Sequence, residues 1–157
     1  MKGNDKVIAV LNEALQEELL AINQYFLHAE MCENWKYETL SKFIKKQSID
    51  EMKHAEKLIE RILFLDATPS VIGPATLKVG KNVKEQLAND LELELGAVKL
   101  YNDAIKLSRD LGDNATAEFL QGILADEEGH LDWLESQLHL IHEIGYERYL
   151  SKQVRED

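Results

Sequence analysis

Four stretches of this chain carry apolar residues at a spacing of three and four, which is the period of an α-helix that buries one face. Each stripe is narrow, as the core-facing side of a helix in a four-helix bundle must be. The stripes span residues 8–29, 40–65, 87–105 and 120–141. Breaks at 34–36 and 111–114 separate the first stripe from the second and the third from the fourth, so we expect two antiparallel helical hairpins.

The connection between the two hairpins is the longest in the chain, from about Ala67 to Asn82, and it holds both prolines together with Gly73 and Gly80. Fully extended, it could reach roughly 50 Å, whereas a helix of about 26 residues is roughly 39 Å long. The connection can therefore return the chain to the other end of the bundle. We predict an all-α, ferritin-like four-helix bundle with one long crossover and a short fifth helix around 146–152.

Six polar residues interrupt the apolar stripes, and their spacing is the strongest signal in the sequence. Glu18 precedes Glu51 by 33 residues, and Glu94 precedes Glu127 by the same number. An offset of 76 relates the two halves throughout, and it also aligns "ELLAINQY" with "ELGAVKLY" and "DEMKH" with "DEEGH". This pattern indicates an internal duplication of a helical hairpin. The six residues are Glu18, Glu51, His54, Glu94, Glu127 and His130.

Hairpin geometry predicts that these six side chains meet at one level of the core. The midpoint of each Glu–Glu pair falls at or beside the turn of its hairpin, so the paired residues lie at equal height. Residues three apart in each Glu-x-x-His share one helix face. Four buried carboxylates without partners would be very costly, and two divalent cations would cancel their charge. Mixed oxygen and imidazole ligands suit iron or manganese, in the pattern known from di-iron and di-manganese bundles.

Length and composition restrict the class of protein. The 157 residues fit one domain over 1–157, and a net charge of −11 argues against nucleic acid as a partner. The acidity is explained by solubility or, alternatively, by attraction of cations. No apolar run is long enough to cross a membrane, and a single cysteine, Cys32, agrees with a reducing compartment. We therefore expect a cytoplasmic protein.

Other polar and aromatic residues leave alternatives open. Tyr25 and Tyr101 follow Glu18 and Glu94 by two turns, so they either pack in the core with a hydroxyl bonded to a carboxylate or donate electrons beside the metals, as Trp133 could also do. Cys32 is expected to be a small buried or helix-end residue. We interpret the three histidines without matching partners as surface residues: His28, His139 and His142.

The chain resembles the bacterioferritins along essentially its whole length, in "AINQYFLHA", "SIDEMKHA", "IERILFL", "DEEGH" and "DWLE". The resemblance implies a ferroxidase that oxidises Fe²⁺ with O₂ or H₂O₂ at a site holding two non-haem iron ions per subunit. The ligands would be the six residues above, with Glu51 and Glu127 bridging the metals. It also implies a hollow cage of two dozen subunits that stores ferric mineral, and a reductant partner such as a ferredoxin. One departure is Lys46, where some members carry a histidine that pairs with Asp50 to hold an extra iron, so Asp50 is a doubtful ligand here.

Met52 breaks the repeat, because its counterpart is Glu128. It lies about 100° from Glu51 on a helix, on a largely apolar flank that suggests a subunit contact and that includes Leu19, Asn23, Phe26 and Ile49. Met52 could simply fill that contact. The resemblance instead implies a haem shared between two subunits, with Met52 of each chain as an axial ligand on a two-fold axis.

Two competing functions are compatible with parts of the sequence. A rubrerythrin-like protein or a manganese catalase would use a similar di-metal site, although the chain has no Cys-x-x-Cys pair for a rubredoxin domain. A non-catalytic helical adaptor is the second alternative, and it leaves the six polar core residues unexplained.

Overall fold

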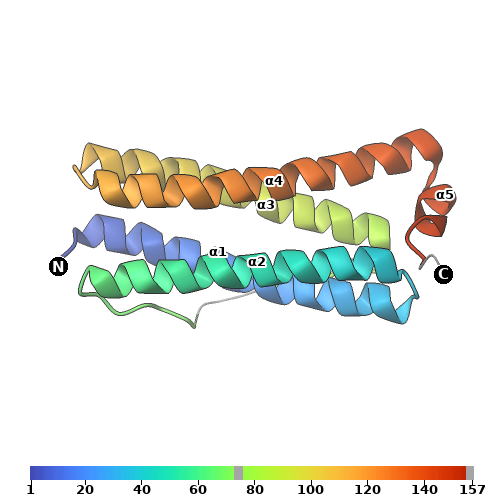
Figure 1. Ribbon diagram of the computed structural model, residues 1–157, viewed down its shortest axis with the longest axis horizontal. Helices are drawn as coiled ribbons and strands as arrows, with labels where there is room; N and C mark the ends of the chain where they lie inside the picture. Colours follow the sequence, from blue (N-terminus) through green and yellow to red (C-terminus); the bar gives the residue numbers. More distant parts are fainter. Residues whose placement is uncertain (73–75, 155–157) are drawn as a thin grey trace.

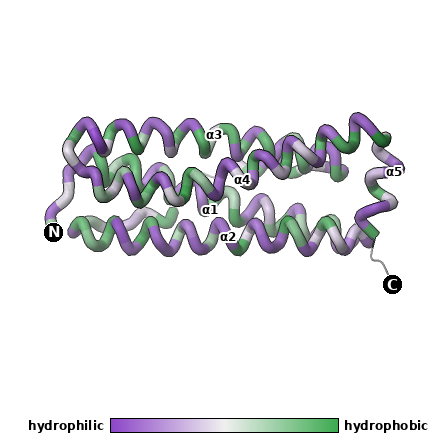
Figure 2. The backbone as a smooth tube through the Cα atoms, turned by 45° about the horizontal axis from the view of Figure 1, so that its top comes forward, coloured by the Kyte–Doolittle hydropathy of each residue, from purple (hydrophilic) through white to green (hydrophobic). Residues whose placement is uncertain are grey.

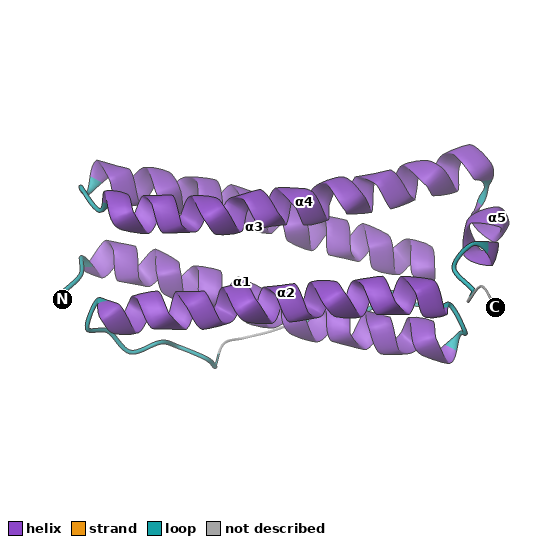
Figure 3. Ribbon diagram, viewed as in Figure 1, coloured by secondary structure: helices purple, strands orange, loops and turns teal. Residues whose placement is uncertain are grey.

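The computed structural model describes residues 1–72 and 76–154. Helices dominate these residues, and no strand occurs in them (Figure 3). The helices are α1 (Asp5–Asn34), α2 (Glu38–Phe64), α3 (Val83–Asp110), α4 (Asn114–Ile144) and the short α5 (Tyr146–Ser151). The predicted all-α fold and the two predicted breaks are confirmed.

The four long helices form one bundle of two antiparallel hairpins, α1–α2 and α3–α4 (Figure 1). The crossover leaves the end of α2 beside the N-terminus and leads to the start of α3 at the opposite end of the bundle, where α5 also lies. This is the predicted ferritin-like topology. Gly73 and Pro74 of the crossover lie outside the described residues. None of the described helices combines the length and the apolar character that a membrane span requires.

The two hairpin turns have the same geometry, as the duplication predicts. Lys36 and Gly112, which are 76 residues apart, both have a positive φ, of 70° and 78°. In each turn an amide bonds back to the carbonyl five residues earlier, from Tyr37 to Cys32 at 2.9 Å and from Asp113 to Ser108 at 2.8 Å. This is the Schellman closure of a helix C-terminus, which favours glycine at the left-handed position. The first hairpin therefore carries a lysine where the backbone favours glycine.

The apolar core is divided into two clusters by a polar layer. Each long helix alternates apolar and polar residues along its length (Figure 2). One cluster lies toward the N-terminal end of the bundle and includes Leu11, Leu58 and Leu120. The other lies toward α5 and includes Ile44, Leu87 and Leu134. The six polar core residues lie in sequence between the members of these clusters on their helices, so both ends of the polar layer are enclosed by packed side chains.

A buried polar network holds the end of the crossover against α1 and α3, and it corrects the prediction for His28. His28 is fully buried, with its Nδ1 2.9 Å from Asp90 Oδ1, and its Nε2 accepts a hydrogen bond of 3.0 Å from the Gly80 amide. The surface assignment was wrong because the crossover, distant in sequence, covers this side of α1. His139 and His142 are exposed, as predicted.

Gly80 is required by the same contact. A Cβ atom at this position would lie 2.3 Å from the amide nitrogen of Gln86, which is far closer than side-chain atoms approach backbone. The crossover can therefore reach His28 only because residue 80 has no side chain.

Candidate metal centre

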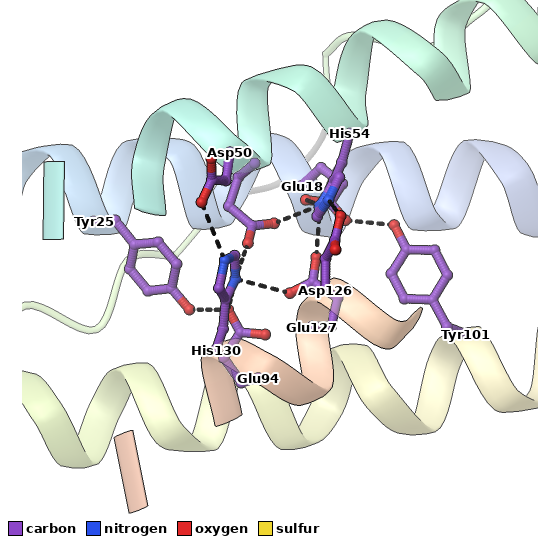
Figure 4. Close-up of polar contacts among 10 residues, drawn as sticks. Glu18, Tyr25, Asp50, His54, Glu94, Tyr101, Asp126, Glu127 and His130 are labelled. Carbon is purple, nitrogen blue, oxygen red and sulfur yellow. Dashed lines mark hydrogen bonds and ion pairs between the residues drawn. The ribbon is translucent and has the colours of Figure 1, made fainter. Parts of the chain in front are cut away.

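The six predicted residues meet at one level inside the bundle, with Glu18 on α1, Glu51 and His54 on α2, Glu94 on α3 and the last two on α4 (Figure 4). All six are buried, and none is more than 9% exposed. The spacing of 33 residues within each hairpin and the Glu-x-x-His periodicity together produce this convergence. The geometric prediction is confirmed, and the assignment of these residues as metal ligands stays a proposal.

Their side-chain atoms form two overlapping groups, each able to surround one ion. Glu18, Glu51, His54 and Glu127 make the first group, and Glu51, Glu94, Glu127 and His130 make the second. Within each group the potential ligand atoms all lie within 4.8 Å of one another. Glu51 and Glu127 belong to both groups, so each of these carboxylates lies within reach of both positions. Each position then has one further carboxylate and one imidazole.

Several polar atoms of this cluster lack a hydrogen-bond partner, although His54 Nδ1 and Glu127 Oε1 lie within hydrogen-bond reach at 3.0 Å. Four carboxylate oxygens and one imidazole nitrogen are buried without a hydrogen-bond partner, namely Glu18 Oε2, Glu51 Oε1, Glu94 Oε2, Glu127 Oε2 and His130 Nδ1. His130 Nδ1 lies only 2.7 Å from Glu51 Oε1, yet the two atoms do not form a hydrogen bond. Buried polar atoms are nearly always satisfied in native proteins, so this residue set fits a pair of cations.

Each histidine turns Nδ1 toward the cluster and Nε2 toward an aspartate of the other hairpin. His54 Nε2 lies 2.9 Å from Asp126 Oδ2, and His130 Nε2 lies 3.5 Å from Asp50 Oδ2. A carboxylate behind a metal-binding imidazole fixes its tautomer and raises its basicity. We did not predict this role for either aspartate. The signal was present in the sequence, because Asp50 and Asp126 are themselves related by the offset of 76.

Two tyrosines repeat this exchange between hairpins. The buried hydroxyl of Tyr25 donates a hydrogen bond to Glu94, and that of Tyr101 donates to Glu18 (Figure 4). Both rings are fully buried, which confirms the prediction of core packing with a carboxylate-bound hydroxyl. Each tyrosine hydroxyl bonds to one carboxylate oxygen of Glu94 or Glu18. The other oxygen of that carboxylate is left facing the cluster.

Burial and mutual repulsion leave protons in this cluster when no metal compensates its charge. Burial raises the pKa of Glu18 to about 8, and Glu51 raises it further against the opposing effect of His54. Burial likewise raises the pKa of Glu94 well above its usual value. Burial alone would lower the pKa of His130, but the carboxylates of Glu127, Glu51 and Glu94 outweigh it and raise the pKa to about 12. The same balance raises the pKa of His54. Cations that bind here must displace these protons.

Met52 lies outside this cluster, on the exposed flank that the sequence predicts. Its side chain is 48% exposed, and the neighbouring stripe contains Ile49 and Phe26, which are 47% and 53% exposed. Large apolar side chains exposed together on one helix pair indicate a surface that another molecule covers. The assignment of Met52 as a haem ligand stays a prediction.

The remaining predicted residues lie apart from the cluster. Trp133 stacks on Phe43 with ring centroids 4.2 Å apart, and Lys46 is exposed. Cys32 is buried near the end of α1, as predicted, and its thiol donates to Gln86 at 3.3 Å.

Comparison with known proteins identifies the class first. A family model described as the ferritin-like domain matches residues 8–144, a region that covers the four long helices except for the first three residues of α1 and includes the six core polar residues.

The curated relatives are more specific. The chain is 46% identical to the bacterioferritin of Brucella melitensis, with 95% of this chain and 92% of the relative covered. It is 42% identical to the bacterioferritin of Mycolicibacterium paratuberculosis, with 98% and 97% covered, and 42% identical to that of Streptomyces coelicolor, with 99% and 93% covered. The chain therefore belongs to the bacterioferritin family of ferritin-like proteins.

Proposed function

We propose that this protein stores iron in the cytoplasm and is a ferroxidase. Two Fe²⁺ ions bind at the six-residue centre, and Glu51 and Glu127 bridge them. Each Fe²⁺ ion loses one electron, and the two electrons together with two protons from water reduce O₂ to H₂O₂, or H₂O₂ to two water molecules. The observation that carries this proposal is the set of five buried, unpartnered ligand atoms that converge on two positions.

The chain's own groups have separate tasks in this reaction. The four glutamates supply four negative charges, which match two divalent ions when both histidines are neutral. Asp126 holds the Nε2–H of His54 and Asp50 lies 3.5 Å from Nε2 of His130, so both Nδ1 atoms can face the metals. Tyr25 and Tyr101 fix the outer oxygens of Glu94 and Glu18. Protons released from the cluster on metal binding leave through these hydrogen-bonded groups or through water.

The assignment is tested with Glu18→Ala and His130→Ala, followed by the rapid phase of Fe²⁺ oxidation in a stopped-flow spectrometer. Matched controls are Glu56→Ala and His139→Ala, which remove the same groups from exposed positions of α2 and α4. We expect the first pair to lose the rapid phase and the second pair to keep it. Normal kinetics in both core variants would refute the site.

Membership of the bacterioferritin family supports a second part of the proposal, which concerns how the subunits assemble. Ferric ions would enter a mineral inside a hollow cage of two dozen subunits, and a ferredoxin-type reductant would return the iron to Fe²⁺. Light scattering coupled to size-exclusion chromatography tests the assembly, because a monomer or simple dimer at physiological salt is incompatible with storage.

Met52 is the residue that would hold haem. The thioether sits on an exposed apolar face of α1 and α2, and a two-fold axis through that face would supply an identical second ligand. Bound haem would carry electrons toward the stored iron, and two thioether ligands favour its ferrous state. We expect Met52→Leu to abolish haem binding while Fe²⁺ oxidation continues, and Met52→His to shift the haem spectrum. Full haem retention in the Leu variant would contradict this role.

A further inference from the structure

A pocket on the α1–α3 side of the bundle leads toward the metal centre. It has a volume of about 220 Å³, and its walls include Leu20 and Gln24 of α1, Gly96 of α3 and Lys78 of the crossover. Behind it lies a void of about 10 Å³ among the four core glutamates. The pocket and the void have two lining residues in common, Glu17 and Leu93. These two side chains therefore separate the outer pocket from the centre.

The inner void is sized for a single small particle. About 10 Å³ corresponds to roughly one water-sized sphere. Its lining includes Glu18, Glu94 and Glu127, each of which has a buried oxygen without a hydrogen-bond partner. A cation is the ligand that this lining would stabilise, because several carboxylate oxygens here have no hydrogen-bond donor to balance their negative charge.

Glu17 is the group in the outer pocket that can receive such a cation. It is the chain neighbour of Glu18 and half-buried. The Glu17 carboxylate forms no hydrogen bond and no ion pair with any residue that the structure describes. Glu92, the other acidic residue of this pocket, is paired with Lys78 at 2.6 Å. The negative charge of Glu17 is therefore uncompensated beside the apolar Leu93.

We propose that Glu17 is a transit ligand, which binds a divalent cation briefly between the α1–α3 pocket and the di-metal centre. A cation that passes Leu93 into a one-particle void must give up most of its hydration water, and the Glu17 carboxylate replaces part of that shell. The ion then transfers to the adjacent Glu18. This inference rests on the proposed function, because it needs the six-residue centre to bind Fe²⁺.

The test is the rate at which the assembled protein takes up Co²⁺, which is not oxidised under these conditions and absorbs visible light when bound. We expect Glu17→Gln to slow uptake by about five-fold or more, as loss of a steering charge does, with two Co²⁺ per chain still bound at equilibrium. Glu13→Gln is the matched control, because Glu13 is an exposed glutamate on the same helix, and its rate should equal that of the wild type. Glu17→Asp, which keeps the charge, should retain most of the rate.

The outcomes separate the two proposals. An unchanged rate of Co²⁺ uptake in Glu17→Gln overturns the transit role alone. Loss of bound Co²⁺ at equilibrium in the same variant also overturns it, because Glu17 would then be part of the centre itself. If the wild type binds no Co²⁺, the proposed function and this inference both fail.

A second pair of variants tests the route without touching a carboxylate. Gly96 lines the α1–α3 pocket, and Gly129 lines a pocket of about 360 Å³ on the α2–α4 side, beside His54 and His130. A Cβ atom at either glycine meets no atom within 4 Å, so both positions accept a side chain that fills the space outside. Gly96→Leu should slow Co²⁺ uptake and Gly129→Leu should not. The reverse result would place the route on the α2–α4 side and refute the inference.

Discussion

Glu18→Gln should stabilise the metal-free protein and weaken its metal binding. The pKa of Glu18 rises from its usual value of 4.5 to about 8, chiefly because the carboxyl is buried. Folding therefore tightens proton binding by this group, so the stability of the metal-free protein falls as the pH rises from about 4.5 to about 8. At pH 7 the folded protein keeps Glu18 protonated, and holding this proton costs roughly 3 kcal/mol, since a tenfold change in proton affinity is worth about 1.4 kcal/mol.

Glutamine removes this cost and keeps the shape of the side chain. Its amide oxygen can still accept the hydrogen bond from Tyr101. For a chain of this size, about 3 kcal/mol corresponds to a rise in melting temperature of roughly 6–12 °C. The histidines add a pH dependence of the same sign, because the raised pKa of His130 supplies stability that is complete below about 6.5 and is lost as the pH rises toward 12. The Glu18→Gln variant should therefore also melt at a lower temperature at alkaline pH, although by less than the wild type.

The assay is thermal unfolding followed by circular dichroism, with a chelator present, at pH 6 and pH 8.5. The Glu18→Gln variant should exceed the wild type more at pH 8.5 than at pH 6, and Glu56→Gln, at an exposed position of α2, should match the wild type at both. Saturating Co²⁺ should reverse the order, because only the wild type has the complete ligand set. Our reasoning is refuted if Glu18→Gln melts below the metal-free wild type at pH 8.5, or if both show the same difference between the two pH values.

Three further predictions concern the residues around the centre and the backbone. Asp126→Ala should weaken Co²⁺ binding about 10–100-fold, since it releases the Nε2–H of His54; equilibrium titration measures this, with the exposed Glu128→Ala as control, and equal affinities would exclude the orienting role. Lys36→Gly should raise the free energy of unfolding by about 0.5–1 kcal/mol in denaturant titrations, because φ is 70° there, and a destabilised variant would contradict this. Gly80→Ala should cost at least about 2 kcal/mol through its clash with Gln86, and a wild-type melting temperature would show that the crossover is not tightly held.

The sequence by itself determined the fold class and the position of the six core residues. Both follow from short-range regularities, since helical period places Glu51 and His54 on one face, and equal distance from a turn places Glu18 level with Glu51. The offset of 76 residues carried the same argument to the second hairpin. It even extends to the paired turns, where Lys36 and Gly112 adopt the same left-handed backbone.

The tertiary structure decided what depends on contacts between segments far apart in the chain. The spacing within one hairpin cannot show that Asp126 reaches His54 or that Tyr101 reaches Glu18, because each of these contacts crosses from one hairpin to the other. The same limit explains the error at His28, whose partners are Asp90 and the backbone of Gly80. It also applies to Glu17, which looks like an ordinary helix glutamate in the sequence and lines the approach to the centre only because α3 packs against α1. Periodicity specifies which face of a helix is buried, but only the packed bundle specifies which side chain of another segment meets it there.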